Sequence, residues 1–202
     1  KKLAIENLRK GMEKSERRGT NDINLPILQI REQDLEGAMT TLKSIMEAGI
    51  ESADVYYFLA EIYLNTGRTD KAEAYFRKAV EVNEKYIRAR EKLAHILVMK
   101  GEFEEAEKVL GSNDGDFADI YKIMGDIQFY RHNFDKAEEY YRRSLEINSE
   151  YTDVLISLSI VLRNKGENQR AQETLIRALE VEPDNLAARN LIGEGPLNIE
   201  NL

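Results

Sequence analysis

The sequence predicts an all-α protein built from stacked pairs of antiparallel helices, and three observations carry this prediction. Alanine recurs in steps of 34, 34, 34, 31 and 34 residues, as Ala4, Ala38, Ala72, Ala106, Ala137 and Ala171. A fixed period of this length indicates stacked repeats, none of which buries its apolar face alone. Within each repeat the apolar residues follow helical spacing. Only 3 prolines and 12 glycines occur in 202 residues, which favours long helices.

The best-preserved repeat spans residues 53–86. Its first predicted helix ends near Gly67, and its second carries Ala72, Phe76 and Ala79. Glycine at this turn predicts a left-handed helix cap, because glycine has no Cβ to clash there. The same place is taken by Gly101 and Gly166 in later repeats, and by His132, which we therefore expect to be a loop residue with the same backbone.

We predict that residues 1–18 form either the second helix of an incomplete repeat or a capping helix. A third interpretation, ranked behind these two, is a basic helix that lies on a membrane. Residues 19–52 form a degenerate repeat, in which Pro26 predicts a short first helix that starts near Asn24. The repeat at 87–117 has lost three residues, which predicts a shortened second helix. Repeats at 118–151 and 152–185 follow, and 186–202 read as a C-terminal capping helix and tail.

This pattern resembles the tetratricopeptide repeat family over nearly the whole chain. In residues 53–86 the matching residues are Tyr56, Leu59, Ala60, Tyr63, Gly67, Ala72, Phe76 and Ala79. Three further repeats match in register. The resemblance implies a right-handed superhelical solenoid whose inner face, lined by the first helix of each repeat, holds an extended peptide or a helix.

Steps of three and four residues identify the side chains that should line this groove. The predicted groove residues are Asp54, Tyr57, Glu61, Asn65, Arg88, Glu91, His95, Met99, Lys122, Asp126, Phe129 and Tyr130. Carboxylates outnumber basic groups on the inner face, and aromatic residues stand where packing does not need them. We therefore expect a basic or apolar peptide segment as the ligand.

One subfamily of this family binds acidic chaperone tails through a clamp of Lys, Asn and Arg. Here Tyr57 and Glu61 stand in the places of the first Lys and the Asn. A carboxylate there would repel an acidic tail, so we predict no binding of this type.

The sequence lacks the residues that several other classes of function require. With a net charge of −8 the chain is a poor partner for nucleic acid, and no apolar run is long enough to cross a membrane. There is no cysteine and no glycine-rich phosphate loop, and the Glu91 and His95 pair lacks a third ligand. We predict no catalytic residues, no metal site and no cofactor. We interpret pairs such as Glu138-Glu139 as solvated charges at the start of second helices.

The sequence therefore predicts a non-catalytic scaffold or adaptor that binds a protein or peptide partner. Two alternatives stay open. The chain could be a regulatory or substrate-recruiting arm of a larger enzyme, which its start inside a repeat favours, or it could self-associate through exposed repeat ends. The absence of cysteine fits the cytoplasm and leaves the periplasm open.

Overall fold

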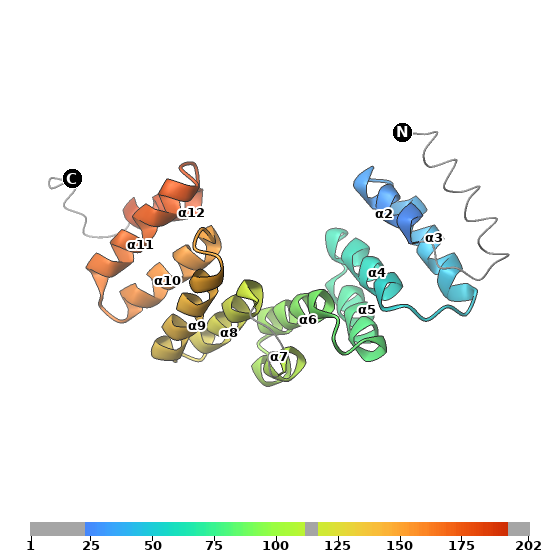
Figure 1. The fold of residues 1–202 in the computed structure, drawn as a ribbon, viewed down its shortest axis with the longest axis horizontal. Coiled ribbons are helices and arrows are strands. Elements are labelled where there is room, and N and C mark those ends of the chain that lie inside the picture. Colours follow the sequence, from blue (N-terminus) through green and yellow to red (C-terminus); the bar gives the residue numbers. More distant parts are fainter. Residues whose placement is uncertain (1–22, 112–116, 194–202) are drawn as a thin grey trace. The chain divides into compact units, whose positions relative to one another are not determined.

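The computed structural model describes residues 23–111 and 117–193, and these residues form helices and turns without a strand. The helices follow one another in packed pairs (Figure 1). The first helices of the pairs are α2 (Asn24–Arg31), α4 (Ala53–Asn65), α6 (Ile87–Lys100), α8 (Ala118–Tyr130), α10 (Thr152–Asn164) and α12 (Leu186–Gly193). The second helices are α3 (Leu35–Glu47), α5 (Thr69–Val82), α7 (Phe103–Leu110), α9 (Phe134–Ile147) and α11 (Asn168–Val181). The all-α fold of consecutive helix pairs that the sequence predicts is confirmed.

The chain divides into two compact units, an N-terminal unit of residues 1–96 and a C-terminal unit of residues 97–202. In the N-terminal unit, α3 packs against α4 through the buried residues Ala38, Leu42, Ile45, Val55, Leu59 and Ile62. In the C-terminal unit, α9, α10 and α11 share the buried residues Ala137, Tyr141, Val154, Leu158, Val161, Leu162 and Ala171. Each core therefore draws on neighbouring repeats, as stacked repeats require.

The turn inside each pair uses one residue in the left-handed region. Gly67, Gly101 and Gly166 have φ values of 71°, 79° and 81°, and the non-glycine residues Gln33 and His132 adopt 62° and 59° in the same place. The next residue then donates its backbone N–H across the turn, as Arg68 does to the Tyr63 carbonyl at 2.8 Å. The left-handed caps expected at these glycines and at His132 are confirmed.

Among the described residues α2, α7 and α12 have 8 residues each, and the first two are short for reasons that the sequence shows. The helix α2 begins at Asn24 and has 8 residues, with Pro26 in its first turn, where a proline leaves no hydrogen bond unmade. The helix α7 also has 8 residues, whereas α5 has 14. The predicted helix at 1–18 and the tail beyond residue 193 lie outside the described residues, so their expected roles stay predictions.

Candidate functional site

The predicted groove residues lie on α4, α6 and α8, and they divide between the two units. In the N-terminal unit these are Asp54, Tyr57, Glu61, Asn65, Arg88, Glu91 and His95, and in the C-terminal unit they are Met99, Lys122, Asp126, Phe129 and Tyr130. In each unit taken by itself, we call the exposed parts of the first helices that carry these steps of three and four residues its first-helix face. In the N-terminal unit α4 and residues 87–96 carry it, and in the C-terminal unit Met99, α8 and α10 carry it.

Tyr57 is a core residue, and its expected place as an open groove side chain is wrong. Its side chain is 1% exposed. The rings of Phe76 and Tyr86 lie 5.7 and 5.3 Å from its own, and the Arg88 guanidinium lies 5.0 Å from the ring centre. Burial, followed by the charge of Glu61, raises the pKa of the Tyr57 hydroxyl. Tyr57 therefore stabilises the packing of α4 against its neighbours.

Asp54 is held by a hydrogen bond that recurs in a later repeat. The Tyr86 hydroxyl donates to Asp54 Oδ1 at 2.7 Å, and Tyr151 donates to Asp119 Oδ1 at 2.6 Å, across 32 residues in both cases. Burial, then the bond to Asp54, raises the pKa of Tyr86 well above its usual range, so the phenol keeps the proton that it donates. In these two repeats, the tyrosine at the end of the repeat is therefore hydrogen-bonded to the first helix of the same repeat.

The acidic part of the N-terminal face centres on Glu61. Its Oε1 atom is buried without a hydrogen-bond partner among the described residues, and the Lys92 ammonium lies 4.0 Å away. The rest of the side chain reaches solvent, being 28% exposed. Asn65, Arg88 and His95 are exposed on the same helices. This part of the first-helix face combines a weakly compensated carboxylate with accessible polar groups.

The helix α8 carries a different arrangement. The Lys122 ammonium lies 2.7 Å from Asp126 Oδ2, and the Tyr141 hydroxyl donates to Asp126 Oδ1 at 2.7 Å. Lys122 and Asp126 have side chains only 20% and 15% exposed. Burial, then the charge of Asp126, raises the pKa of Tyr141 far above its usual range, so its hydroxyl is a permanent donor. Asp126 is thus compensated and held in one orientation.

An aromatic cluster stands at the end of α8. Tyr130 is 53% exposed although its ring stacks on Phe103 at 5.9 Å and meets Phe129 edge-on at 5.7 Å. Phe129 in turn lies 5.9 Å from Phe134 and packs against the core. Met99, at the same position of the preceding repeat, is 72% exposed. This part of the first-helix face is apolar and open.

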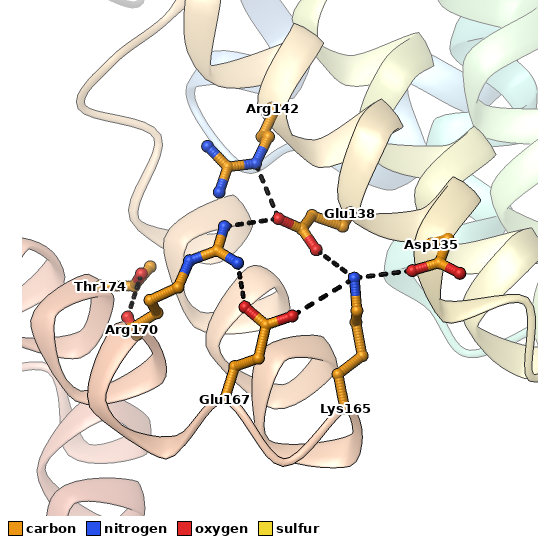
Figure 2. A network of polar contacts seen from close by, with 7 residues as sticks. All are labelled: Asp135, Glu138, Arg142, Lys165, Glu167, Arg170 and Thr174. Atoms are coloured by element: carbon orange, nitrogen blue, oxygen red, sulfur yellow. Dashed lines mark hydrogen bonds and ion pairs between the residues drawn. The ribbon is translucent and has the colours of Figure 1, made fainter.

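Glu138 differs from its sequence prediction of a solvated charge at a helix start. It is 8% exposed and lies at the centre of an ion network between α9, α10 and α11, drawn in Figure 2. Lys165 Nζ and Arg170 Nη2 each lie 2.7 Å from its carboxylate, and Arg142 Nε lies 2.9 Å away. Lys165 also reaches Asp135 at 2.7 Å. The expectation of a solvated charge at a helix start is therefore wrong for Glu138.

Burial alone raises the pKa of Glu138, but the hydrogen bonds from Lys165, Arg142 and Arg170 outweigh it and lower the pKa to about 2. A related network surrounds Glu107, which accepts from Gln128 at 3.1 Å and from Arg131 at 2.7 Å. Glu107 and Glu138 follow the marker alanines Ala106 and Ala137 directly. A glutamate recurring there, with a basic residue ending the next first helix, is the signal that could have revealed these networks.

Chemistry beyond binding has few candidate groups in the described part of the chain. Residues 23–111 and 117–193 contain no cluster of three or more His, Asp or Glu side chains that could hold a metal ion. Across the same residues, no helix combines the length and the apolar character that crossing a bilayer requires.

The chain is similar to known proteins in its repeats and in its fold. Models of the tetratricopeptide repeat match residues 53–86 and 129–194. The chain is 27% identical over 131 residues to the human protein O-mannosyl-transferase TMTC1, a match that covers 63% of this chain and 14% of that protein. It is 23% identical over 152 residues to mouse anaphase-promoting complex subunit 7, covering 73% of this chain and 26% of that protein. The chain therefore spans about a quarter or less of these two relatives.

Solved structures share the fold. PilF from Pseudomonas aeruginosa superposes with a TM-score of 0.72 at 20% identity, covering 82% of this chain and 77% of PilF. YrrB, described as a TPR protein with an unusual peptide-binding site, gives a TM-score of 0.66 at 19% identity, covering 84% of this chain and 89% of YrrB. These likenesses show a shared fold. The repeat models that match residues 53–86 and 129–194 identify the chain as a tetratricopeptide repeat protein.

Proposed function

We propose that the first-helix face of the C-terminal unit binds an extended partner segment of apolar or basic character, and that the chain acts as a non-catalytic adaptor. As a tetratricopeptide repeat protein the chain is a protein–protein interaction scaffold. The proposal adds where the partner binds and what its chemistry is. The peptide-binding site attributed to YrrB, which shares this fold, supports a peptide as the ligand.

The observation that carries the proposal is the exposure of Tyr130. A tyrosine that is 53% exposed, yet fixed by Phe103 and Phe129, presents a flat apolar surface whose position is already set. Binding to such a ring costs little side-chain entropy, and tyrosine is enriched among the residues that dominate interface energies. Met99 adds an adaptable apolar contact.

The first-helix face of the N-terminal unit offers a separate place for a basic side chain of a partner. In the part of the chain that the structure describes, the cation facing Glu61 is Lys92 at 4.0 Å, so a closer ammonium or guanidinium of a partner would gain an ion pair there. Asp126 is less available for this, because Lys122 and Tyr141 already occupy both of its oxygens.

The test is selection from a phage-displayed library of random dodecapeptides, followed by titration of one selected peptide. We expect enrichment of aromatic, aliphatic and basic residues over Asp and Glu. Tyr130→Asn should weaken binding at least about tenfold, as loss of a binding hot spot does. Asparagine is a suitable replacement because Asn65 and Asn164 hold the same position in other repeats.

Ile147→Asn is the matched control. Ile147 is 45% exposed and lies at the end of a second helix, so asparagine there also replaces a large exposed apolar side chain, but away from the first-helix face. We expect its affinity to equal that of the wild type. Equal losses in both variants, or no loss with Tyr130→Asn, would contradict the proposed binding face.

Self-association is the second candidate, and one observation favours it. Leu186, at the start of α12, is 73% exposed, and Val181 at the end of α11 is 38% exposed. A second copy that covered these residues would bury apolar surface. Sedimentation velocity at several concentrations tests this: a concentration-dependent dimer that Leu186→Ser abolishes supports it, and a monomer throughout opposes it.

The likeness to a transferase supports a third reading, in which the array is a recruiting arm of a larger protein. The matched region is 14% of that transferase. Sequencing the full transcript decides this, since the reading requires a catalytic domain in the same open reading frame.

A further inference from the structure

The Lys122 ammonium, on the first-helix face of the C-terminal unit, has hydrogen-bond donors that are not used within the described part of the chain. We propose that Lys122 donates a hydrogen bond to a backbone carbonyl of the bound segment and so fixes its register on α8. This inference rests on the proposed function and names the group of the partner that α8 recognises.

Lys122 has more N–H donors than there are acceptor atoms bound to it among the described residues. An ammonium carries three N–H groups. Asp126 Oδ2, at 2.7 Å, is the acceptor of Lys122 among the described residues, while its side chain is only 20% exposed. Two donors are thus left to water or to a ligand, in a place where each hydrogen bond counts for more than it does in bulk water.

The charge of the pair selects a neutral acceptor. Lys122 and Asp126 sum to zero, and the Asp126 carboxylate lies within 2.7 Å of the ammonium. A ligand carboxylate that approached Lys122 would meet this second negative charge, which repels it. A peptide carbonyl carries no net charge, accepts hydrogen bonds strongly and is present at every residue of an extended segment.

The pair belongs to one repeat only. The corresponding two positions hold Tyr57 and Glu61 in residues 53–86, and Ile156 and Ile160 in residues 152–185. In residues 87–117 they hold Glu91 and His95. Lys122 can therefore anchor one point of a segment, while the apolar side chains of α8 and α10 accept its neighbours.

Tyr141 is a positioning residue for this anchor. Its hydroxyl, on a side chain that is 1% exposed, holds Asp126 Oδ1, and Asp126 holds Lys122. A donor fixed in this way loses little conformational entropy when the ligand binds, which is the advantage of preorganisation.

Helix geometry sets the register. Lys122 and Tyr130 are eight residues apart on α8, which corresponds to roughly 12 Å along a helix axis. For an extended segment that lies along α8 and rises about 3.3 Å per residue, roughly 12 Å spans three to four residues. The carbonyl that Lys122 binds should therefore lie three or four residues from the side chain that contacts Tyr130.

The experiment is an amide-to-ester scan of the dodecapeptide selected above, made with an amidated C-terminus. An ester carbonyl accepts hydrogen bonds more weakly than an amide carbonyl. We expect one ester, three or four residues from the residue that contacts Tyr130, to bind the wild type about tenfold more weakly. The same ester should cause no further loss with Lys122→Met, which itself weakens the parent peptide about tenfold.

Circular dichroism and the melting temperature establish that Lys122→Met folds, and Lys122→Gln replaces it if it does not. Lys136→Met is the matched control, because Lys136 is an exposed lysine on the second helix α9, away from the first-helix face. This variant makes the same chemical change and should leave the affinity unchanged.

Three results would overturn the inference. If Tyr130→Asn weakens binding but no ester couples to Lys122, the anchor is wrong while the binding face stands. If binding requires a free C-terminal carboxylate, Lys122 recognises an anion. If Tyr130→Asn has no effect, the proposed face itself fails, and the anchor fails with it.

Discussion

Tyr141 reaches from α9 to α8 and donates a 2.7 Å hydrogen bond to Asp126. The ring passes directly over Gly125, and a Cβ atom at that residue would lie 2.5 Å from the Tyr141 ring. The close approach of the two helices in this repeat therefore depends on the missing side chain of Gly125, and the orientation of Asp126 depends on that approach.

Gly125→Ala should lower the free energy of unfolding by about 1–3 kcal/mol, the range for overpacking a tight interior. In an exposed helix the same substitution would raise the free energy of unfolding, because alanine is the better helix former by about 1 kcal/mol. A loss of stability would therefore point to the close contact with Tyr141. Urea unfolding measures the change. Gly193→Ala is the control, since a Cβ there meets no atom within 4 Å. A stabilised Gly125→Ala would show that the two helices can separate without cost.

Tyr57→Ala should destabilise the protein by about 3–5 kcal/mol, as truncation of a buried aromatic residue does. Tyr57 is 1% exposed and contacts Phe76 and Tyr86. Tyr130→Asn, at a residue that is 53% exposed, should cost less than about 1 kcal/mol. Thermal unfolding of the two variants separates the structural tyrosine from the binding one, and similar losses in both would contradict that assignment.

Glu138→Gln should lower the free energy of unfolding at pH 7 by about 2–3 kcal/mol, because three cations then lose a charged partner in a buried site. The effect should depend on pH in a defined direction. The pKa of Glu138 is about 2 in the folded protein, below the usual value near 4.3 of an unfolded chain. Its stabilising contribution is therefore complete above the unfolded pKa and is lost as the pH falls toward 2.

Urea unfolding of wild type and Glu138→Gln between pH 7 and pH 2.5 checks this, and the difference between them should shrink as the solution becomes more acidic. Glu139→Gln is the control, because its side chain is 58% exposed and surface ion pairs contribute at most about 1 kcal/mol. A difference that stays constant with pH would mean that the Glu138 charge does not stabilise the fold.

His132→Gly should stabilise the protein by up to about 1 kcal/mol. His132 has a φ of 59°, a conformation that costs a residue with a Cβ roughly 1–2 kcal/mol. Glycine removes this strain but loses more entropy on folding, so the net gain is small. Gly166→Ala, at a φ of 81°, should show the opposite sign. A loss of stability in both variants would indicate that the edge contact of His132 with Phe134 matters more than its backbone.

The sequence predicted the fold well because the repeat enforces it. Regular alanines mark the closest helix contacts, glycines mark the left-handed turns, and Pro26 placed the start of α2 at Asn24. These features depend on residues within one repeat, where spacing along the chain is enough to assign a position.

The side chains of the site were harder to assign because their surroundings come from distant parts of the chain, often from the neighbouring repeat. Tyr57 has groove spacing, yet Tyr86, at the end of the same repeat, and Arg88, from the next repeat, cover it. Glu138 stands at a helix start, yet it is buried by Lys165 and Arg170, which lie 27 and 32 residues further along the chain. Helical periodicity identifies a face but does not show which side chain of the next repeat lies upon it.

Titration of one selected dodecapeptide against wild type, Tyr130→Asn and Ile147→Asn tests the central claim most directly. Binding to the first-helix face predicts an affinity at least about tenfold weaker for Tyr130→Asn and unchanged for Ile147→Asn, with melting temperatures that stay close to wild type. Equal affinities for all three proteins would contradict it.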